Sequence, residues 1–212
     1  METVSRRSVM GIAAGVIAGG VLAGETAVLG SSTAENPDPK PDVPASGKSE
    51  SVYKFRMSHA PPRRYGDSSI REHKLHDFPM SASMSASLIA LAPGDVREPH
   101  WHPNSDEWLF VIAGTIRMTI VDGKGEASQF DCGLEDVAFT PQGFGHYVEN
   151  IGDGEAKLML IHNHAEFTTV NLSEWVAAGS TSVFASTLKM PVQAFDDAPT
   201  KRVFISPKGL QK

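Results

Sequence analysis

The sequence predicts an all-β domain, a sandwich or barrel of short antiparallel strands, with short helices only near its C-terminal end. Between residues 87 and 161, short apolar runs alternate with turn residues at close spacing. The breaks are rich in glycine and proline, for example Pro93-Gly94 and Asp122-Gly123, and antiparallel strands reverse at such residues. No internal repeat is visible, which excludes a duplicated, two-domain version of the fold.

Six apolar runs are expected to form strands. They cover residues 87–91, 108–112, 115–121, 137–140, 147–150 and 157–161. In the third run, apolar side chains alternate with polar ones. The apolar set is Ile116, Met118 and Ile120, and the polar set is Thr115, Arg117 and Thr119. This alternation predicts a strand with one buried face and one solvated face.

The region after residue 170 is expected to be helical. Asn171 lies three residues before Glu174, which is the spacing of a capping pair at a helix start, and Gly179 can close that helix. A second short helix is expected over residues 181–188, where Pro191 would end it.

Length, charge and cysteine content limit the class of protein. A chain of 212 residues can hold one domain with a substantial core. Its 19 Lys and Arg residues against 25 Asp and Glu residues give a net charge of −6, which argues against nucleic acid as a partner. Cys132 is the only cysteine, so an internal disulfide is impossible.

The first 34 residues have features of an export signal. An arginine pair, Arg6 and Arg7, precedes an apolar but glycine-diluted run that ends before Glu25. This run is too short and too weakly apolar for a comfortable membrane span. Residues 1–34 therefore resemble a twin-arginine signal peptide, and we expect a periplasmic or extracellular protein without stable membrane association after cleavage. An uncleaved membrane anchor is the alternative.

Residues 35–51 are expected to form a disordered linker. The segment contains prolines at positions 37, 39, 41 and 44 and no large apolar residue beyond Val43. Such a composition buries too little apolar surface to offset the entropy lost on ordering. We expect the folded domain to cover residues 52–212.

Three histidines and a glutamate suggest a metal site. His100 and His102 are two apart, so in a strand they face the same way, and Glu107 follows after a short turn. His146 follows a glycine turn and opens another strand. Three neutral imidazoles and one carboxylate suit a divalent transition ion with open positions for water or substrate, whereas calcium is disfavoured. The alternative is that each histidine is an isolated hydrogen-bonded residue.

Together with nearby glycines, these residues resemble the two motifs of the cupin family. The first motif corresponds to Gly94, His100, His102, Glu107 and Gly114, and the second to Pro141, Gly143, His146 and Asn150. One position departs from the pattern, because Glu135 stands where a glycine is usual, and glutamate tolerates positive φ less well. The resemblance implies a cupin-type double-stranded β-helix, a jelly-roll barrel, with short C-terminal helices.

A more specific resemblance covers residues 65–207. The stretches "REPHWHPNSDEW" and "GHYVENIG" resemble one half of an oxalate decarboxylase, a cupin that is commonly two such domains long. The resemblance implies oxalate as the small-molecule substrate, Mn²⁺ as the cofactor and dioxygen as a redox co-catalyst. It also implies conversion of oxalate to formate and CO2.

The resemblance also implies catalytic roles for two further residues. Arg97, three residues before the first histidine, would pair with the bound oxalate and is expected at the mouth of the site. Glu166 is the carboxylate in the loop that corresponds to the family's mobile lid, and it would donate the proton that forms formate. Without that proton, the same chemistry would give CO2 and hydrogen peroxide, which is oxalate oxidase activity.

Four further points concern alternatives and residues without an assigned role. A non-catalytic, metal-dependent binder of small carboxylic acids is an alternative to an enzyme, as is another cupin reaction. A homo-oligomer is expected, because cupins often pair through edge strands. His162 and His164 form a second His-x-His without a partner carboxylate, so we expect them to line the cavity mouth rather than bind metal. Trp101, on the strand face opposite the ligands, is expected in the core.

Overall fold

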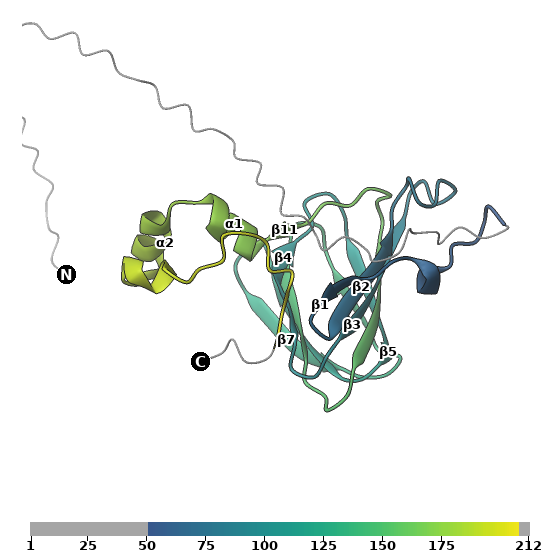
Figure 1. The fold of residues 1–212 in the computed structure, drawn as a ribbon, viewed down its shortest axis with the longest axis horizontal. Helices are drawn as coiled ribbons and strands as arrows, with labels where there is room; N and C mark the ends of the chain where they lie inside the picture. Colours follow the sequence, from purple (N-terminus) through teal and green to yellow (C-terminus); the bar gives the residue numbers. More distant parts are fainter. Residues whose placement is uncertain (1–50, 208–212) are drawn as a thin grey trace, which may run out of the picture. The chain divides into compact units, whose positions relative to one another are not determined.

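Two antiparallel sheets face each other in the computed structural model, which describes residues 51–207 (Figure 1). The first sheet contains, in spatial order, β1 (Arg63–Tyr65), β2 (Ser68–His73), β3 (Ser85–Leu91), β10 (Ala156–His162), β5 (Glu107–Ala113) and β8 (Val137–Thr140). The second contains β11 (Val170–Asn171), β4 (Val96–Trp101), β9 (Gly145–Asn150), β6 (Ile116–Val121) and β7 (Ala127–Cys132), with β12 (Ile205–Ser206) paired to β4.

From β3 to β5 and again from β8 to β11, successive strands lie in opposite sheets. Each crossing lets the inward face of one strand pack on the inward face of the next. This connectivity is that of a jelly-roll barrel, and the predicted all-β cupin fold is therefore confirmed.

The core lies between the two sheets. β3 and β10 alternate strictly between buried and partly exposed residues, as expected for strands with one face in the interior. The largest fully buried side chains come from both sheets, and they include Leu91, Leu109, Ile116, Met118 and Leu158. Burial of each such side chain contributes about 1.5–3 kcal/mol, so the strands that carry the site are held by apolar packing.

The six predicted strands are all present, with ends that differ by up to two residues. The strands that prediction missed are polar ones, such as β7, whose first five residues are exposed at a sheet edge. Thr119 was predicted on the solvated face but is buried; its cross-strand partner on β7, Gln129, donates a hydrogen bond to its hydroxyl at 3.0 Å.

Trp101 also differs from expectation. Its ring is only partly buried, and it packs edge-on against Trp175 of the first helix at 5.5 Å between ring centroids. The side of β4 opposite the ligands is therefore covered by this helix and not by the core between the sheets.

Several tight turns have left-handed backbone conformations, and two of them, at Gly114 and Glu135, bear on the motifs. Gly114 has φ +80°, and a Cβ there would lie 2.7 Å from the Cα atom of Ala156, so only glycine fits. Glu135 has φ +70°. Glu135 therefore makes the turn that a glycine usually makes at this motif position. For a residue with a side chain, this conformation costs roughly 1–2 kcal/mol.

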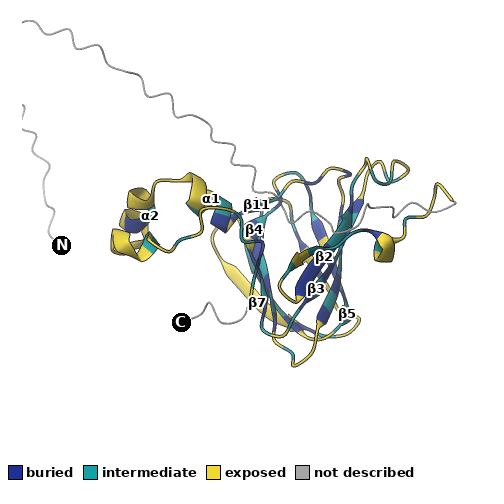
Figure 2. Cartoon of the chain, viewed as in Figure 1, coloured by how far each residue is buried: buried dark blue, intermediate teal, exposed yellow. Residues whose placement is uncertain are grey.

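The predicted helices are confirmed as α1 (Leu172–Ala178) and α2 (Thr181–Leu188), followed by the 3-10 helix η2 (Val192–Phe195). At the start of α1, the Asn171 amide N–H donates to the Glu174 carboxylate at 3.2 Å, as the capping pair predicts. Figure 2 shows that most of this helical segment is exposed. No helix within residues 51–207 is long and apolar enough to span a membrane.

A short 3-10 helix, η1 (Met57–His59), precedes the first strand. The predicted signal, residues 1–34, and nearly all of the predicted linker, residues 35–51, lie outside the described residues, as does the end of the predicted 52–212 domain. These boundaries therefore stay predictions.

Candidate metal centre

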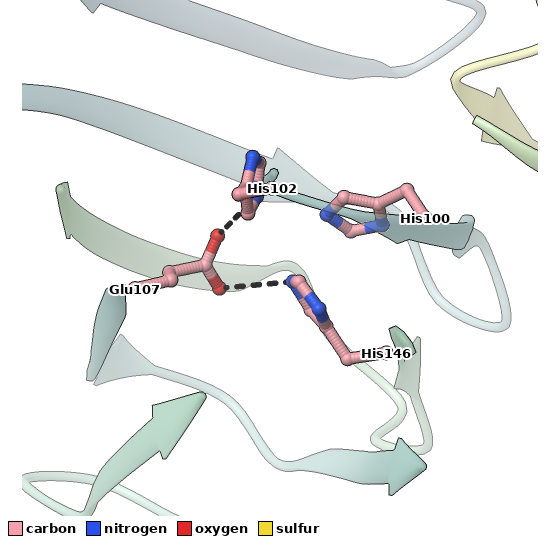
Figure 3. Close-up of side chains that lie close together, drawn as sticks. All are labelled: His100, His102, Glu107 and His146. Atoms are coloured by element: carbon pink, nitrogen blue, oxygen red, sulfur yellow. Dashed lines mark hydrogen bonds and ion pairs between the residues drawn. The ribbon is translucent and has the colours of Figure 1, made fainter. Parts of the chain in front are cut away.

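The four predicted ligands converge at one point inside the barrel (Figure 3). His100 lies near the end of β4, His102 just after it, Glu107 begins β5 and His146 is the second residue of β9. His100 and His146 are direct cross-strand partners, next to an irregularity in the β4–β9 register. The second sheet therefore supplies two of the histidines and the first sheet supplies the carboxylate.

The ligand atoms are close enough for a single ion to contact all of them. One nitrogen or oxygen from each of the four residues lies within 4.8 Å of all the others. Glu107 Oε2 is 3.1 Å from His102 Nε2, and Glu107 Oε1 is 3.5 Å from His146 Nε2. All four side chains are buried, with at most 4% of their surface exposed.

Backbone carbonyls determine which ring nitrogen of each ligand histidine faces the cluster. The Nδ1 atoms of His100, His102 and His146 lie 2.7, 2.9 and 3.1 Å from the carbonyl oxygens of Glu98, Thr168 and Phe144, respectively. A carbonyl can only accept, so each Nδ1 carries the proton and each Nε2 presents a lone pair to the others. This is the tautomer that a metal ion requires.

The charge states suit a cation. Burial and the nearby Arg97 guanidinium lower the pKa of His100 well below its usual value, which keeps this imidazole neutral. Burial raises the pKa of Glu107, but the nearby imidazoles of His146 and His102 outweigh this effect and bring the pKa well below its usual range. His146 Nε2 is buried without a hydrogen-bond partner. An orphaned imidazole nitrogen beside an ionised carboxylate fits a divalent transition ion.

The cluster opens into a cavity of about 330 Å³ that is rich in basic side chains. Arg63, Lys74, Arg97 and Arg202 line it, against the carboxylates of Glu72 and Glu107. Arg63 binds Glu72 through two parallel hydrogen bonds of 2.8 and 2.9 Å. Burial raises the pKa of Glu72, but the Arg63 guanidinium more than offsets this and the pKa is lowered. The cavity therefore favours anions.

Arg97 was expected at the mouth of the site, but it lies in the wall of the cavity. Its side chain is buried, with 3% of its surface exposed. Its Nη1 donates to Asn171 Oδ1 at 2.9 Å and to the Phe204 carbonyl at 3.0 Å, and its guanidinium lies over the Phe204 ring at 3.8 Å. Burial lowers the pKa of Arg97 to about 10, so the side chain remains charged at neutral pH. Arg97 is a fixed cation beside the candidate metal ligands.

Glu166 does not line the cavity in this conformation. Its side chain is exposed, and its Oε1 accepts a hydrogen bond from the Leu75 amide at 3.1 Å. The neighbouring loop residues Phe167, Thr168 and Thr169 do line the cavity. The structure thus brings the four metal-binding candidates and Arg97 together, and places Glu166 on the outer side of the same loop.

The second His-x-His separates into two different environments. His162 is 1% exposed and lies in the cavity wall close to Glu107, deeper than the mouth position expected for it. Burial lowers the pKa of His162 to about 4, so the ring is neutral at physiological pH. His164 is exposed, and its Nδ1 accepts a hydrogen bond from the Glu166 amide.

Sequence reasoning missed the pair formed by Arg63 and Glu72 and the cavity residue Arg202. Arg63 and Glu72 lie on the polar hairpin of β1 and β2, and Arg202 follows the helical segment. No metal-ligand or glycine spacing marks these positions. Only the pairing of β2 with β3 and of β12 with β4 brings these segments to the cavity.

Comparisons with known proteins agree with this geometry. Residues 60–192 match the cupin family model. A probable oxalate decarboxylase of Arthroderma benhamiae is 30% identical over 73% of this chain and 39% of its own length. An oxalate decarboxylase of Bacillus subtilis is 39% identical over 48% of this chain and 26% of its own length. A germin-like protein of Arabidopsis thaliana is 31% identical over 55% of this chain and 52% of its own length.

Solved structures show the same relationship. A structure of Bacillus subtilis oxalate decarboxylase has a TM-score of 0.69 and 28% identity, covering 73% of this chain and 40% of that one. Another, described by its Mn(II) centres, has a TM-score of 0.66 and 29% identity over 70% and 40% of the two chains. The chain thus spans about two fifths of the relatives whose structures it matches, in line with the resemblance to one half of the enzyme. With the family model, the barrel and the two motifs in agreement, the chain belongs to the cupin family, and its cupin domain resembles those of the oxalate decarboxylases.

Proposed function

We propose that this protein is a manganese-dependent enzyme that acts on oxalate, and that it decarboxylates oxalate to formate and CO2. The reaction balances because each singly protonated oxalate ion gives one CO2 and one formate ion. The observation that carries the proposal is the position of Arg97, a buried and charged guanidinium that lines the same cavity as His100, His102 and Glu107.

His100, His102, Glu107 and His146 would hold the ion. When bound, a redox-active divalent ion together with dioxygen supplies one-electron chemistry, which lowers the barrier to breaking the carbon–carbon bond of oxalate. Three imidazoles and one carboxylate leave open positions for a substrate oxygen on an ion of higher coordination number. The similarity to a structure described by its Mn(II) centres supports manganese as the ion.

Arg97 would bind the substrate. A guanidinium pairs with a carboxylate through parallel hydrogen bonds, and oxalate presents a carboxylate at each end. The contacts of Arg97 with Asn171 and Phe204 hold the guanidinium in place before substrate arrives, so little side-chain entropy is lost on binding. Its neighbours Arg63 and Lys74 add to the attraction of the cavity for a dianion.

Oxalate oxidation is the second candidate; here one oxalic acid molecule and one dioxygen molecule give two CO2 and one hydrogen peroxide. One observation favours it: the Glu166 carboxylate lies outside the cavity lining and is bonded to the Leu75 amide. To donate a proton in decarboxylation, Glu166 must break that bond and the loop of residues 163–169 must move. If the loop keeps this conformation during turnover, Glu166 donates no proton to the product, and this favours oxidase chemistry.

A non-catalytic binder of small carboxylic acids would use the same cavity without turnover. One experiment separates the three functions. Mn-loaded protein is incubated with oxalate in air near pH 5, and formate, hydrogen peroxide and oxygen uptake are measured together. Formate without peroxide supports decarboxylation, peroxide without formate supports oxidation, and neither product supports a binder.

Export by the twin-arginine pathway belongs to the same proposal. The arginine pair Arg6-Arg7 supports this pathway, because such a pair is its recognition signal. The pathway carries folded proteins, so manganese would be able to bind before export. Manganese is near the weak end of the divalent affinity series, so ligands exposed outside the cytoplasm would otherwise select copper or zinc. Metal analysis after export by an unfolded-chain pathway tests this: mainly manganese in that protein would contradict the idea.

A further inference from the structure

His162 faces the candidate metal centre from the first sheet. It ends β10 and is the direct cross-strand partner of Glu107 on β5. It is 1% exposed, and its Nε2 lies 3.8 Å from Glu107 Oε2. Its ring is also 4.6 Å from that of the ligand His102, centroid to centroid. The site therefore contains a fourth buried imidazole that the cupin motifs do not include.

The surroundings of His162 differ from those of the three ligand histidines. Each ligand Nδ1 faces a backbone carbonyl, which can only accept a hydrogen bond; His102 Nδ1 also lies 3.2 Å from the Thr169 hydroxyl, farther than its carbonyl partner at 2.9 Å. His162 Nδ1 faces the hydroxyl of Ser105 at 3.4 Å, and a hydroxyl can donate. If Ser105 donates to Nδ1, the ring proton of the neutral imidazole is on Nε2, the atom that points to Glu107. With this tautomer, His162 would offer a proton to the cluster, whereas the ligand histidines offer a lone pair.

The ring of His162 is held in one orientation. It stacks on Phe167 with the centroids 3.8 Å apart and the planes 10° from parallel. Phe167 is itself buried and belongs to the loop that lines the cavity. A ring fixed on one face by an aromatic side chain can direct a hydrogen bond with little loss of side-chain entropy.

Binding of an ion changes which hydrogen-bond donors are available to the Glu107 carboxylate. Oε2 of Glu107 is 3.1 Å from His102 Nε2, but a nitrogen whose lone pair binds an ion carries no proton and cannot donate a hydrogen bond to Glu107. The carboxylate oxygen then requires another donor, because buried carboxylate oxygens are rarely left unsatisfied. His162 Nε2 is the remaining ring nitrogen near this oxygen, and a small ring movement brings it within hydrogen-bond distance.

We propose that His162 is a positioning residue for the metal centre: its Nε2–H donates to the Glu107 carboxylate, orients it toward the ion, and leaves the ligand set at His100, His102, Glu107 and His146. This inference rests on the metal site of the proposed function and is independent of the reaction with oxalate.

The test uses the full chain loaded with Mn²⁺, without oxalate. Binding of Mn²⁺ is measured by titration, and the loaded protein is examined by electron paramagnetic resonance, with electron spin echo modulation to count coordinated imidazoles. H162F keeps an aromatic ring but removes the donor, and we expect a 10- to 100-fold loss of Mn²⁺ affinity with altered fine structure and an unchanged imidazole count. H162Q retains an N–H donor and should restore most of the affinity.

Two more variants keep the test decisive. S105A removes only the hydroxyl that sets the tautomer, so we expect a smaller loss of affinity, several-fold, even if H162F fails to fold. H164F makes the same chemical change at the exposed histidine two residues away and should leave Mn²⁺ binding unchanged.

Three results would overturn the proposal. The first is an Mn²⁺ affinity of H162F within two-fold of the parent, with unchanged fine structure. The second is the loss of an imidazole coupling in H162F, which would make His162 a ligand. The third is a parent-like Mn²⁺ affinity of S105A. Absence of Mn²⁺ binding by the parent chain would overturn both proposals. A chain that binds Mn²⁺ but forms neither formate nor peroxide would contradict the enzymatic function alone.

Discussion

The metal cluster and the loop of residues 163–169 border the same cavity but are built differently. The four cluster residues lie in or next to strands of both sheets, and each is at most 4% exposed. In the loop, Asn163, His164, Glu166 and Thr168 are exposed. Asn104 holds the loop through its side chain, which donates to the Glu166 carbonyl and accepts from the Thr168 amide.

This difference separates two properties of the site. The candidate metal cluster is part of the barrel and keeps its geometry as long as the strands stay paired. In the proposed function, the choice between decarboxylation and oxidation would depend on a segment held by a few side-chain hydrogen bonds, and such segments open at low energetic cost. On this proposal, the reaction type could change without any change in the candidate metal ligands.

Substitution of Glu107 tests the cluster side of the comparison and has the largest expected effect. E107Q removes the negative charge while keeping the shape, so we expect at least 100-fold weaker Mn²⁺ binding and loss of all oxalate-dependent products. Metal analysis and product assays measure this. E155Q makes the same change on an exposed turn and should behave as the parent. Parent-like Mn²⁺ content in E107Q would show that the cluster does not hold the ion.

Substitution of Arg97 separates substrate binding from metal binding. R97K keeps the charge but loses the planar pair of donors. A hydrogen bond to a charged group contributes roughly 1.5–3 kcal/mol, so we expect kcat/KM to fall on the order of 100-fold, which corresponds to about 3 kcal/mol of lost transition-state stabilisation. Mn²⁺ content should not change. R117K, in an exposed ion pair with Asp131, is the matched control. Activity of R97K equal to that of R117K would remove Arg97 from the site.

Substitution of Glu166 tests the loop side. E166A should lower formate production by at least about 10-fold, because positioned general acids contribute roughly 100-fold or more, and should spare oxalate-dependent oxygen uptake. Formate, peroxide and oxygen are measured in one reaction, and Mn²⁺ affinity is measured separately. Unchanged formate output would remove Glu166 from the mechanism and leave the proton donor elsewhere in the cavity.

Loosening the loop should give the smallest effect. N104A removes the hydrogen bonds that Asn104 makes with Glu166 and Thr168, each of which contributes about 1 kcal/mol. We expect a few-fold change in the ratio of formate to peroxide and faster hydrogen exchange over residues 163–169, with unchanged Mn²⁺ affinity. A loss of Mn²⁺ binding in N104A would mean that cluster and loop are not independent.

The features that local spacing determines could be predicted from the sequence. His100, His102, Glu107 and His146 follow from strand periodicity and two glycine-framed turns, and the six apolar strands follow from their alternation with turn residues. The helix start at Asn171 was predictable for the same reason, because a capping pair needs only residues three apart.

The rest depends on contacts between distant segments. His162 reaches Glu107 only because β10 pairs with β5 in one register, and Arg63 reaches the cavity only through the β1–β2 hairpin. Glu166 turns outward because the Leu75 amide, distant in sequence, binds its carboxylate. β7 was missed because a polar strand at a sheet edge lacks apolar alternation.

The contact between Arg97 and Phe204 makes the segment that leads into β12 part of the wall of the basic cavity. β12 pairs with β4 directly opposite Arg97, and the Phe204 carbonyl accepts from the guanidinium. Proteolytic trimming upstream of Phe204 would therefore release this guanidinium while all four metal ligands stay in place. Such a trimmed protein should still take up manganese but bind oxalate poorly, and a purification tag is more safely attached beyond residue 207 than within this segment.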